Sequence, residues 1–162
     1  MWLRASVDAD RVGGDSCRMS TLEDAIALAV DAHRGQKDKV GEPYVLHPLR
    51  VMFRLGWDAP PSVRMAAVLH DVVEDTKVTL SELRRLGYPE EVLRAVELLS
   101  RRHEDTYEQF VERLLPNRIA RLVKRADLED NMELRRLPGV AEKDLERLAR
   151  YRAAWTRIVQ AG

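Results

Sequence analysis

Cysteine is almost absent from this chain, since Cys17 is the only one among 162 residues. An internal disulfide and a zinc site built on several thiolates are therefore excluded, and the composition suits a reducing compartment. No apolar stretch is long enough to cross a membrane, and the amino-terminal residues lack the apolar core of a secretion signal. These absences predict a cytoplasmic protein.

Net charge is absent as well, because 27 basic residues balance 27 acidic ones. A neutral chain has no overall field that would hold nucleic acid or an anionic membrane. We therefore expect neither of these as a partner, and any binding of phosphate must come from local clusters of basic side chains. The composition leaves the oligomeric state open.

Several catalytic motifs and strand signals are also missing. The chain contains no Walker loop, no GxGxxG, no nucleophile elbow, no strand-like alternation of useful length and no repeat. It contains instead a succession of amphipathic segments separated by short polar loops. The sequence predicts an all-α bundle of about seven or eight helices. We expect one domain over residues 21–162, preceded by a mobile arm of residues 1–20.

The strongest chemical signal is the stretch HDVVEDT, which begins at His70 and follows a strongly apolar run. A continuous buried helix would place His70 above Glu74 and Asp71 above Asp75. Several carboxylates on a buried helix are costly unless something compensates their charge. A divalent metal is a suitable compensator because it accepts both imidazole nitrogen and carboxylate oxygen. The alternative is a solvated helix end whose charges face water.

Two more places in the chain carry similar residues. His47 precedes Pro48, a residue suited to the first turn of a helix. Asp127 and Asn131, four residues apart, interrupt the apolar face of a helix that Asn117 is expected to cap. Two buried faces that turn polar in one small domain indicate a shared centre. The candidate metal ligands are His47, His70, Asp71 and Asp127. This mixed set suits manganese, iron, zinc or magnesium and leaves coordination positions open for water or substrate.

Groups for catalysis and phosphate binding lie near these candidate ligands. Glu74 and Asp75, one turn further along, could orient a water molecule or take its proton. We expect apolar surroundings to raise their proton affinity. Lys39, Lys124 and Arg125 could neutralise substrate phosphates. For Lys124 and Arg125, a solvated position on the flank of a helix is equally consistent with the sequence.

The two remaining histidines are not expected to bind the metal. His33 ends the apolar face of the first helix and is read as a hydrogen-bonded core residue, whereas His103 lies in a polar loop without apolar neighbours. Helix starts are indicated by capping boxes at Ser20–Glu23 and Thr79–Glu82. Ser62 is the predicted cap of the helix that carries the HDVVEDT stretch.

The sequence resembles the HD-domain metal-dependent phosphohydrolases, and most closely the hydrolase domain of the RelA/SpoT family with its small stand-alone alarmone hydrolases. The resemblance runs from about residue 21 to the end of the chain. The blocks that carry it are Ala32–Gln36, Gly41–Tyr44, His47-Pro48, His70–Thr76, Ala126-Asp127 and Asn131-Met132.

The resemblance implies a manganese centre held by the four candidate ligands. It further implies that Glu74 and Asp75 serve the attacking water, and that Asn131 and Tyr151 line a nucleotide pocket. The reaction so implied is hydrolysis of the 3′-pyrophosphate of ppGpp or pppGpp, which releases pyrophosphate and leaves GDP or GTP.

Three positions depart from the family pattern. Asp38 stands where a basic residue is usual, and Val40 and Leu134 stand where small hydroxyl residues are common. These departures keep two alternatives open. One is an HD phosphohydrolase for a different nucleotide or phosphoester, such as a nucleotide 2′- or 3′-phosphate or NADPH. The other is a non-catalytic nucleotide-sensing module, although the presence of Glu74 and Asp75 beside a full ligand set argues against it.

Overall fold

The computed structural model describes residues 19–136, 139 and 141–162. Cys17 and nearly all of the predicted arm lie outside the described residues, so the mobility of the arm stays a prediction. The helices are α1 (Leu22–Ala32), α2 (Leu46–Arg54), α3 (Pro61–Leu69), α4 (Val72–Asp75), α5 (Leu80–Arg85), α6 (Glu90–Leu99), α7 (Tyr107–Leu114), α8 (Arg118–Asn131) and α9 (Glu142–Gln160), with a short 3₁₀ turn at Leu134–Arg136. The described residues contain no strand, only an isolated bridge between Lys37 and Pro43. The predicted all-α bundle is confirmed.

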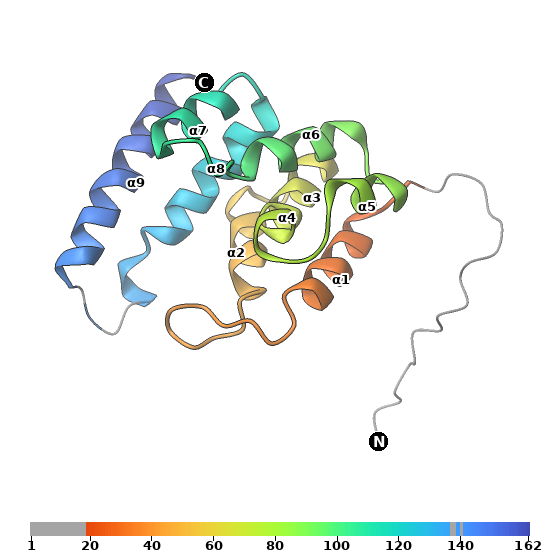
Figure 1. The fold of residues 1–162 in the computed structure, drawn as a ribbon, viewed down its shortest axis with the longest axis horizontal. Coiled ribbons are helices and arrows are strands. Elements are labelled where there is room, and N and C mark those ends of the chain that lie inside the picture. Colours follow the sequence, from red (N-terminus) through yellow and green to blue (C-terminus); the bar gives the residue numbers. More distant parts are fainter. Residues whose placement is uncertain (1–18, 137–138, 140) are drawn as a thin grey trace.

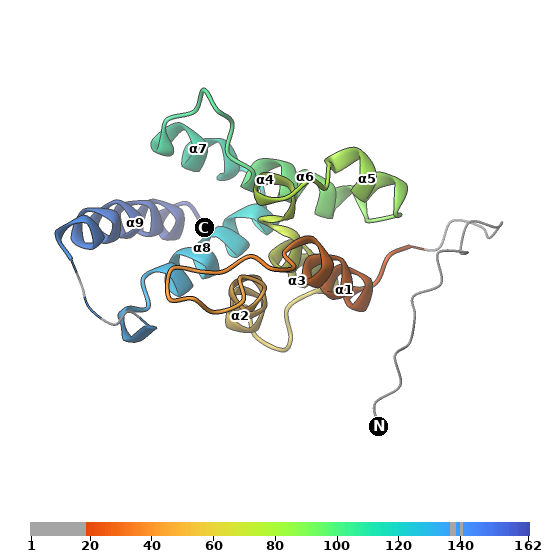
Figure 2. The same ribbon diagram turned by 60° about the horizontal axis from the view of Figure 1, so that its bottom comes forward.

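Helices α3 and α8 form the middle of the bundle (Figures 1 and 2). Helix α3 packs against α1, α2, α6 and α8, while α8 also packs against α2, α6 and α9. Because α3 is covered on almost every side, its side chains from Met65 to Leu69 are all buried. Each fully buried valine or leucine contributes roughly 1.5–3 kcal/mol. The residues that follow α3 and face α8 are therefore held by the best-packed part of the fold.

Two of the four predicted helix caps are confirmed. Thr79 and Glu82 form a capping box, and the Asn117 side chain accepts a hydrogen bond from the Ala120 amide. The capping box of α1 lies one residue later than predicted, at Thr21 and Asp24. Ser20 is not available for it, because its hydroxyl donates to Leu86 and its amide to Gly87 at the end of α5.

The predicted cap at Ser62 is wrong, since α3 begins at Pro61 with Pro60 in the N-cap position. Proline suits the first helical position because its fixed φ matches the helix and its missing N–H would have no partner there. Ser62 therefore lies inside the first turn of the helix.

The helix predicted to carry the whole HDVVEDT stretch is interrupted. Helix α3 ends at Leu69, His70 and Asp71 form a turn, and one further helical turn, α4, begins at Val72. The His70 ring donates from Nδ1 to the Ala67 carbonyl at 2.7 Å. In a continuous helix that carbonyl would accept the backbone N–H of residue 71. The prediction of one continuous helix through the whole stretch is therefore wrong.

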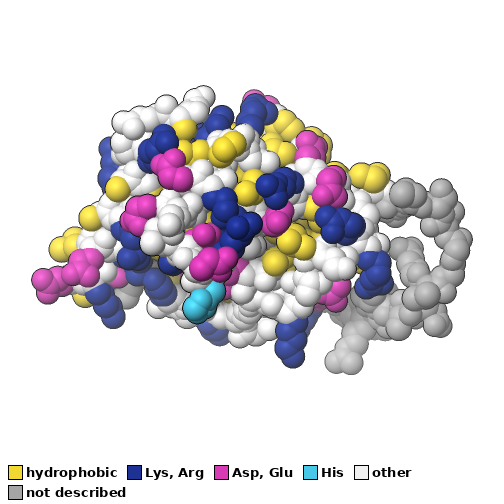
Figure 3. All heavy atoms as spheres, turned by 45° about the horizontal axis from the view of Figure 1, so that its top comes forward, with side chains coloured by type: hydrophobic (Ala, Val, Ile, Leu, Met, Phe, Trp, Pro, Cys, Tyr) yellow, Lys and Arg dark blue, Asp and Glu magenta, His cyan; other side chains and the backbone are white. Residues whose placement is uncertain are grey.

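The surface agrees with the balanced composition. Acidic and basic side chains lie interspersed on the face drawn in Figure 3, in keeping with the formal net charge of zero. Within the described part of the chain, each helix is too short or too polar to traverse a bilayer.

Candidate metal centre

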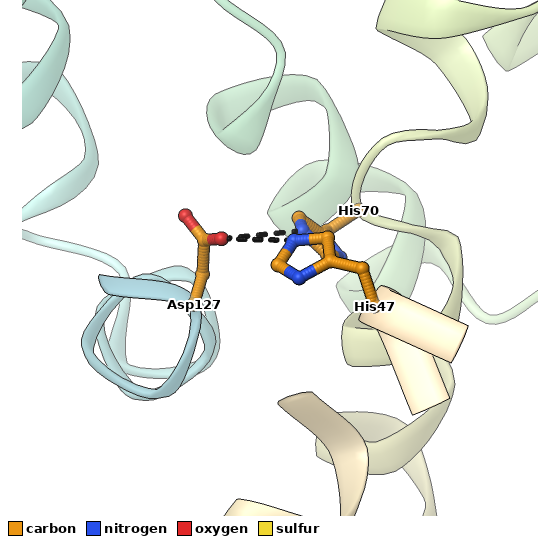
Figure 4. Close-up of side chains that lie close together, drawn as sticks. All are labelled: His47, His70 and Asp127. Carbon is orange, nitrogen blue, oxygen red and sulfur yellow. Dashed lines mark ion pairs between the residues drawn. The ribbon is translucent and has the colours of Figure 1, made fainter. Parts of the chain in front are cut away.

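Three side chains from separate elements meet where α2, α3 and α8 pack together. His47 is the second residue of α2, His70 follows α3, and Asp127 lies on α8; all three are buried. Asp127 Oδ1 is 3.1 Å from His47 Nε2 and 3.8 Å from His70 Nε2. Figure 4 shows the Asp127 carboxylate facing both imidazole rings. Ligand atoms of the three residues lie within 4.8 Å of one another, close enough to share one metal ion.

Asp71 adds a fourth candidate ligand at the edge of this cluster. Its Oδ2 atom lies 3.1 Å from His70 Nε2 and 3.6 Å from His47 Nε2. Its side chain is 19% exposed, compared with 5% for Asp127. The four residues singled out in the sequence are thus neighbours in space. We refer to them below as the metal cluster.

The hydrogen bonds of the two histidines decide which ring nitrogen faces the cluster. His70 Nδ1 lies beside the Ala67 carbonyl, which can only accept, so Nδ1 carries the proton. His70 Nε2 is buried and has no hydrogen-bond partner of good geometry, although Asp71 is near. His47 Nδ1 is 2.9 Å from Asp130 Oδ2. Two Nε2 atoms directed at carboxylates, one of them without a hydrogen bond, form a donor set that a divalent cation would satisfy.

Electrostatics keep the carboxylates of the metal cluster ionised. Burial opposes the charge of Asp127, but the Lys124 ammonium and the two imidazoles hold its pKa well below the usual range. Burial opposes the charge of Asp71 too, yet the neighbouring His70 lowers the Asp71 pKa to about 2. Burial alone would lower the pKa of both histidines, whereas the surrounding carboxylates raise it. Protons and a divalent cation would therefore compete for the same imidazole nitrogens.

The metal cluster faces a cavity of about 520 Å³, a size typical of small-molecule sites. The predicted substrate residues Lys39, Lys124, Asn131 and Tyr151 all line it. Arg125 does not; it is exposed and lies 3.8 Å from Glu129. The substrate-binding roles of these four residues stay predictions.

The residues of the cluster fall within a recognised domain. Residues 25–137 match the family model described as HD domain. This chain belongs to the HD-domain family. The match covers the two histidines and both aspartates of the metal cluster, which confirms the resemblance stated from the sequence.

Relatives with known names match a shorter part of this HD domain. The chain is 45% identical to a GTP pyrophosphokinase of Streptomyces coelicolor over 74 residues, which are 44% of this chain and 8% of that protein. It is 40% identical to the bifunctional (p)ppGpp synthase/hydrolase SpoT of Escherichia coli over 70 residues, 43% of this chain and 10% of that protein. The chain thus spans about a tenth of the length of these curated relatives.

A solved structure matches over most of the chain. It is described as a metazoan ortholog of SpoT that hydrolyzes ppGpp and plays a role in starvation responses. The TM-score is 0.69 at 23% sequence identity, and the match covers 89% of this chain and 88% of the other. At this identity the likeness shows that the two proteins share a fold.

The two predicted catalytic carboxylates of the HD domain differ in their surroundings. Glu74 lines the cavity and accepts a hydrogen bond from the Arg101 amide at 2.8 Å. Although Glu74 is accessible to solvent, desolvation by the surrounding protein raises its pKa. Asp75 is not part of the lining, and its Oδ2 lies 3.1 Å from the Tyr44 hydroxyl.

Tyr44 contacts two of the candidate carboxylates, and the sequence analysis did not predict this. Its hydroxyl lies 2.7 Å from Asp71 Oδ2 as well as 3.1 Å from Asp75 Oδ2. One hydroxyl proton cannot serve both carboxylates at once. Burial and the two carboxylates raise the Tyr44 pKa, so the phenol keeps its proton. Tyr44 thus links a candidate ligand to a candidate base.

Lys124 and Asn131 both contact a carboxylate of the metal cluster. Lys124 Nζ donates to Asp127 Oδ2 at 2.7 Å, and Asn131 Nδ2 donates to Asp127 Oδ1 at 2.6 Å. Their spacing of three and four residues from Asp127 places all three on one face of α8. Burial would lower the pKa of Lys124, but Asp127 raises it, so the ammonium stays charged.

Asp38, an acid where the family usually has a basic residue, has a structural role in the loop between α1 and α2. Asp38 Oδ1 accepts hydrogen bonds from the amides of Val40 and Glu42, each at 3.0 Å. The carboxylate therefore closes a turn of its own loop. Lys39, the next residue, lines the cavity, and its pKa is lowered by partial burial and by Arg147 of α9. Leu134, another of the three departures from the family pattern, is 45% exposed.

The other two histidines lie where they were predicted, one in the core and one in an exposed loop. His33 is buried, and its Nδ1 lies 2.8 Å from Gln36 Oε1. His103 is exposed in the loop between α6 and α7. Several further lining residues were missed in the sequence. Among them are Arg101, Tyr107, Phe110 and Arg147.

Proposed function

We propose that this HD domain is a metal-dependent phosphohydrolase that removes the 3′-pyrophosphate of ppGpp or pppGpp. The observation that carries the proposal is the meeting of two Nε2 atoms and two ionised aspartates beside a nucleotide-sized cavity. The substrate is supported by the names of relatives, among them SpoT, and by the ppGpp hydrolysis described for the structural neighbour. A nucleotide substrate is also consistent with a cytoplasmic location.

The proposed metal ligands are His47, His70, Asp71 and Asp127. Manganese is the proposed ion, with iron, zinc or magnesium as alternatives that the same donor set accepts. When bound, the ion would supply Lewis acidity toward the phosphoryl group and the attacking water. The chain would supply the orientation of the ligands through the Nδ1 hydrogen bonds of both histidines.

Proton transfer in the proposed reaction is assigned to the carboxylates of α4. Water loses a proton as it attacks phosphorus, the bond between phosphorus and the ribose 3′ oxygen breaks, and that oxygen gains a proton. Glu74, which lines the cavity and has a raised pKa, is the proposed proton acceptor. Asp75 is proposed to orient the water or to assist this transfer.

Four further lining residues are proposed to bind the nucleotide. Lys124 offers a largely buried positive charge next to Asp127 and is suited to a phosphoryl oxygen. Lys39, Asn131 and Tyr151 are proposed to contact the rest of the substrate across the cavity.

A substrate panel tests the proposal. Purified protein with manganese is given ppGpp and pppGpp, and pyrophosphate release is measured against the variant Asp71→Ala. Release from both nucleotides by the native chain alone is the expected result. Native protein that binds manganese but leaves both nucleotides intact would contradict the proposed reaction.

The acidic residue in the cavity loop favours a second candidate. Asp38 lies in the cavity lining where the alarmone hydrolases that the sequence resembles usually have a basic residue, so one phosphate contact expected for ppGpp is missing. An HD phosphohydrolase for a nucleotide 2′- or 3′-phosphate or for NADPH would use the same metal cluster. Phosphate release from one of these compounds, without turnover of ppGpp, would support that candidate. Tight nucleotide binding without any turnover would instead support a nucleotide-sensing module.

A further inference from the structure

Asp130 is a buried acid that the proposed chemistry does not use. Its carboxylate is 0% exposed, and Oδ2 lies 2.9 Å from His47 Nδ1. Arg50 Nε donates to Oδ1 at 3.0 Å and to Oδ2 at 3.2 Å, while Arg54 Nε lies 3.4 Å from Oδ1. Both arginine side chains are about one-third exposed, at 30% and 32%. The acid therefore connects a candidate metal ligand to two cations near the surface.

The two histidines of the metal cluster are supported in different ways. His70 donates to a backbone carbonyl of α3, an uncharged acceptor that is present whenever the helix forms. His47 instead relies on a charged side chain from another helix, because Asp130 belongs to α8 and His47 to α2. A carboxylate partner fixes the tautomer and plane of a ligating imidazole and makes its other nitrogen a stronger donor.

We propose that Asp130, held by Arg50 and Arg54, is a positioning residue that orients His47 and sets its strength as a metal ligand. The inference rests on the proposed metal centre. Asp127 and Asp130 are three residues apart on α8, so the same helix supplies one ligand and the support of another. The arginines hold the carboxylate in place and keep it ionised, which leaves the shared proton on His47 Nδ1.

Metal affinity is the first test. Manganese binding is measured by calorimetry for the native protein and for Asp130→Asn, which keeps the shape of the side chain but removes its charge. We expect about 10- to 100-fold weaker binding, the usual effect of losing such a partner. The matched control is Glu129→Gln, the neighbouring residue on α8, whose carboxylate accepts from Trp155 Nε1 at 3.0 Å. This control should bind manganese as the native protein does.

Two outcomes of the calorimetry would overturn the proposal. One is equal affinity of Asp130→Asn and native protein. The other is an equal loss in Glu129→Gln, which would indicate a general effect of charge on α8. A native protein without any manganese binding would contradict the proposed metal centre itself.

Nitrogen NMR of metal-free native protein tests the hydrogen bond separately and does not depend on the folding of a variant. At a pH where the ring is neutral, His47 should carry its proton on Nδ1, opposite to the preference of free histidine. A neutral His47 with its proton on Nε2 would overturn the proposal even if the protein binds manganese.

Discussion

The metal cluster and the wall formed by Lys39, Arg147 and Tyr151 are built differently, although both line one cavity. We call this second group the loop–α9 wall. In the metal cluster, side-chain exposure ranges from 3% to 19%, and each residue contacts charged or polar groups from other elements. In the loop–α9 wall, Lys39 is exposed, and Arg147 pairs at 3.0 Å with Asp144 of its own helix.

This difference indicates how the proposed chemistry and its specificity are divided. The cluster is fixed by the packing of α2, α3 and α8, so its geometry cannot change without disturbing the core. The loop–α9 wall belongs to surface elements, which tolerate substitution. We therefore expect substitutions in the cluster to affect metal and turnover, and substitutions along the cavity loop and the wall to affect substrate affinity.

The largest effect is expected for Asp127→Ala. Loss of a central buried carboxylate should reduce manganese content to background and abolish turnover, while circular dichroism remains helical. Asp105→Asn is a suitable control, because it removes a charge from another largely buried ion pair, 2.9 Å from Arg113. Unchanged metal content in Asp127→Ala would remove this residue from the ligand set.

Replacement of Glu74 should separate catalysis from metal binding. Glu74→Gln is expected to keep manganese and to lower kcat by about 10²- to 10⁴-fold, the usual contribution of a general base. In the native protein a proton acceptor works only when ionised, so the rate should fall as the pH falls through the Glu74 pKa. Because that pKa is raised, the midpoint should lie above the ordinary glutamate value of about 4.3. A rate profile that stays level down to that value would contradict the assignment.

The metal cluster could be predicted from the sequence because its residues interrupt or follow stretches of apolar residues. His70 follows the longest run of buried residues in the described part of the chain, and Asp127 interrupts the apolar face of α8. Periodicity identifies such positions, and paired polar breaks indicate a common centre. It does not reveal which side chain of one helix faces which of another. The contact between Asp130 and His47 therefore escaped prediction, although Asp130 shares a helix with Asp127.

Local hydrogen bonds explain where the sequence analysis was wrong. The bond from His70 to the Ala67 carbonyl interrupts the helix, which apolar periodicity cannot indicate. At Asp38, where the sequence analysis noted only the absence of a basic residue, the carboxylate accepts two amides of its own loop. An aspartate just before a glycine turn is a known signal for this arrangement.

Lys124→Met is expected to have an intermediate effect. Lys124 is only 14% exposed and pairs with Asp127 at 2.7 Å, so its removal leaves a buried carboxylate without its cation. Breaking such a pair costs about 3–5 kcal/mol. A bound metal ion would compensate the same carboxylate, so manganese should raise the Tm of the variant more than that of the native protein. Equal rises measured by thermal denaturation would mean that Lys124 and the metal act independently.

The smallest effect is expected for Asp38→Asn, which tests the division between cluster and loop directly. The asparagine oxygen can still accept the amides of Val40 and Glu42, so the loop should keep its conformation. Only the negative charge is removed from the cavity lining. For an anionic substrate this should lower KM by roughly two- to fivefold, with kcat and manganese affinity unchanged. The reason is that the charge of Asp38 repels the bound substrate and the transition state equally. A change in kcat or in metal affinity would instead mean that the loop carrying Asp38 and the metal cluster are coupled, and that substrate preference in this HD domain cannot be altered at the loop alone.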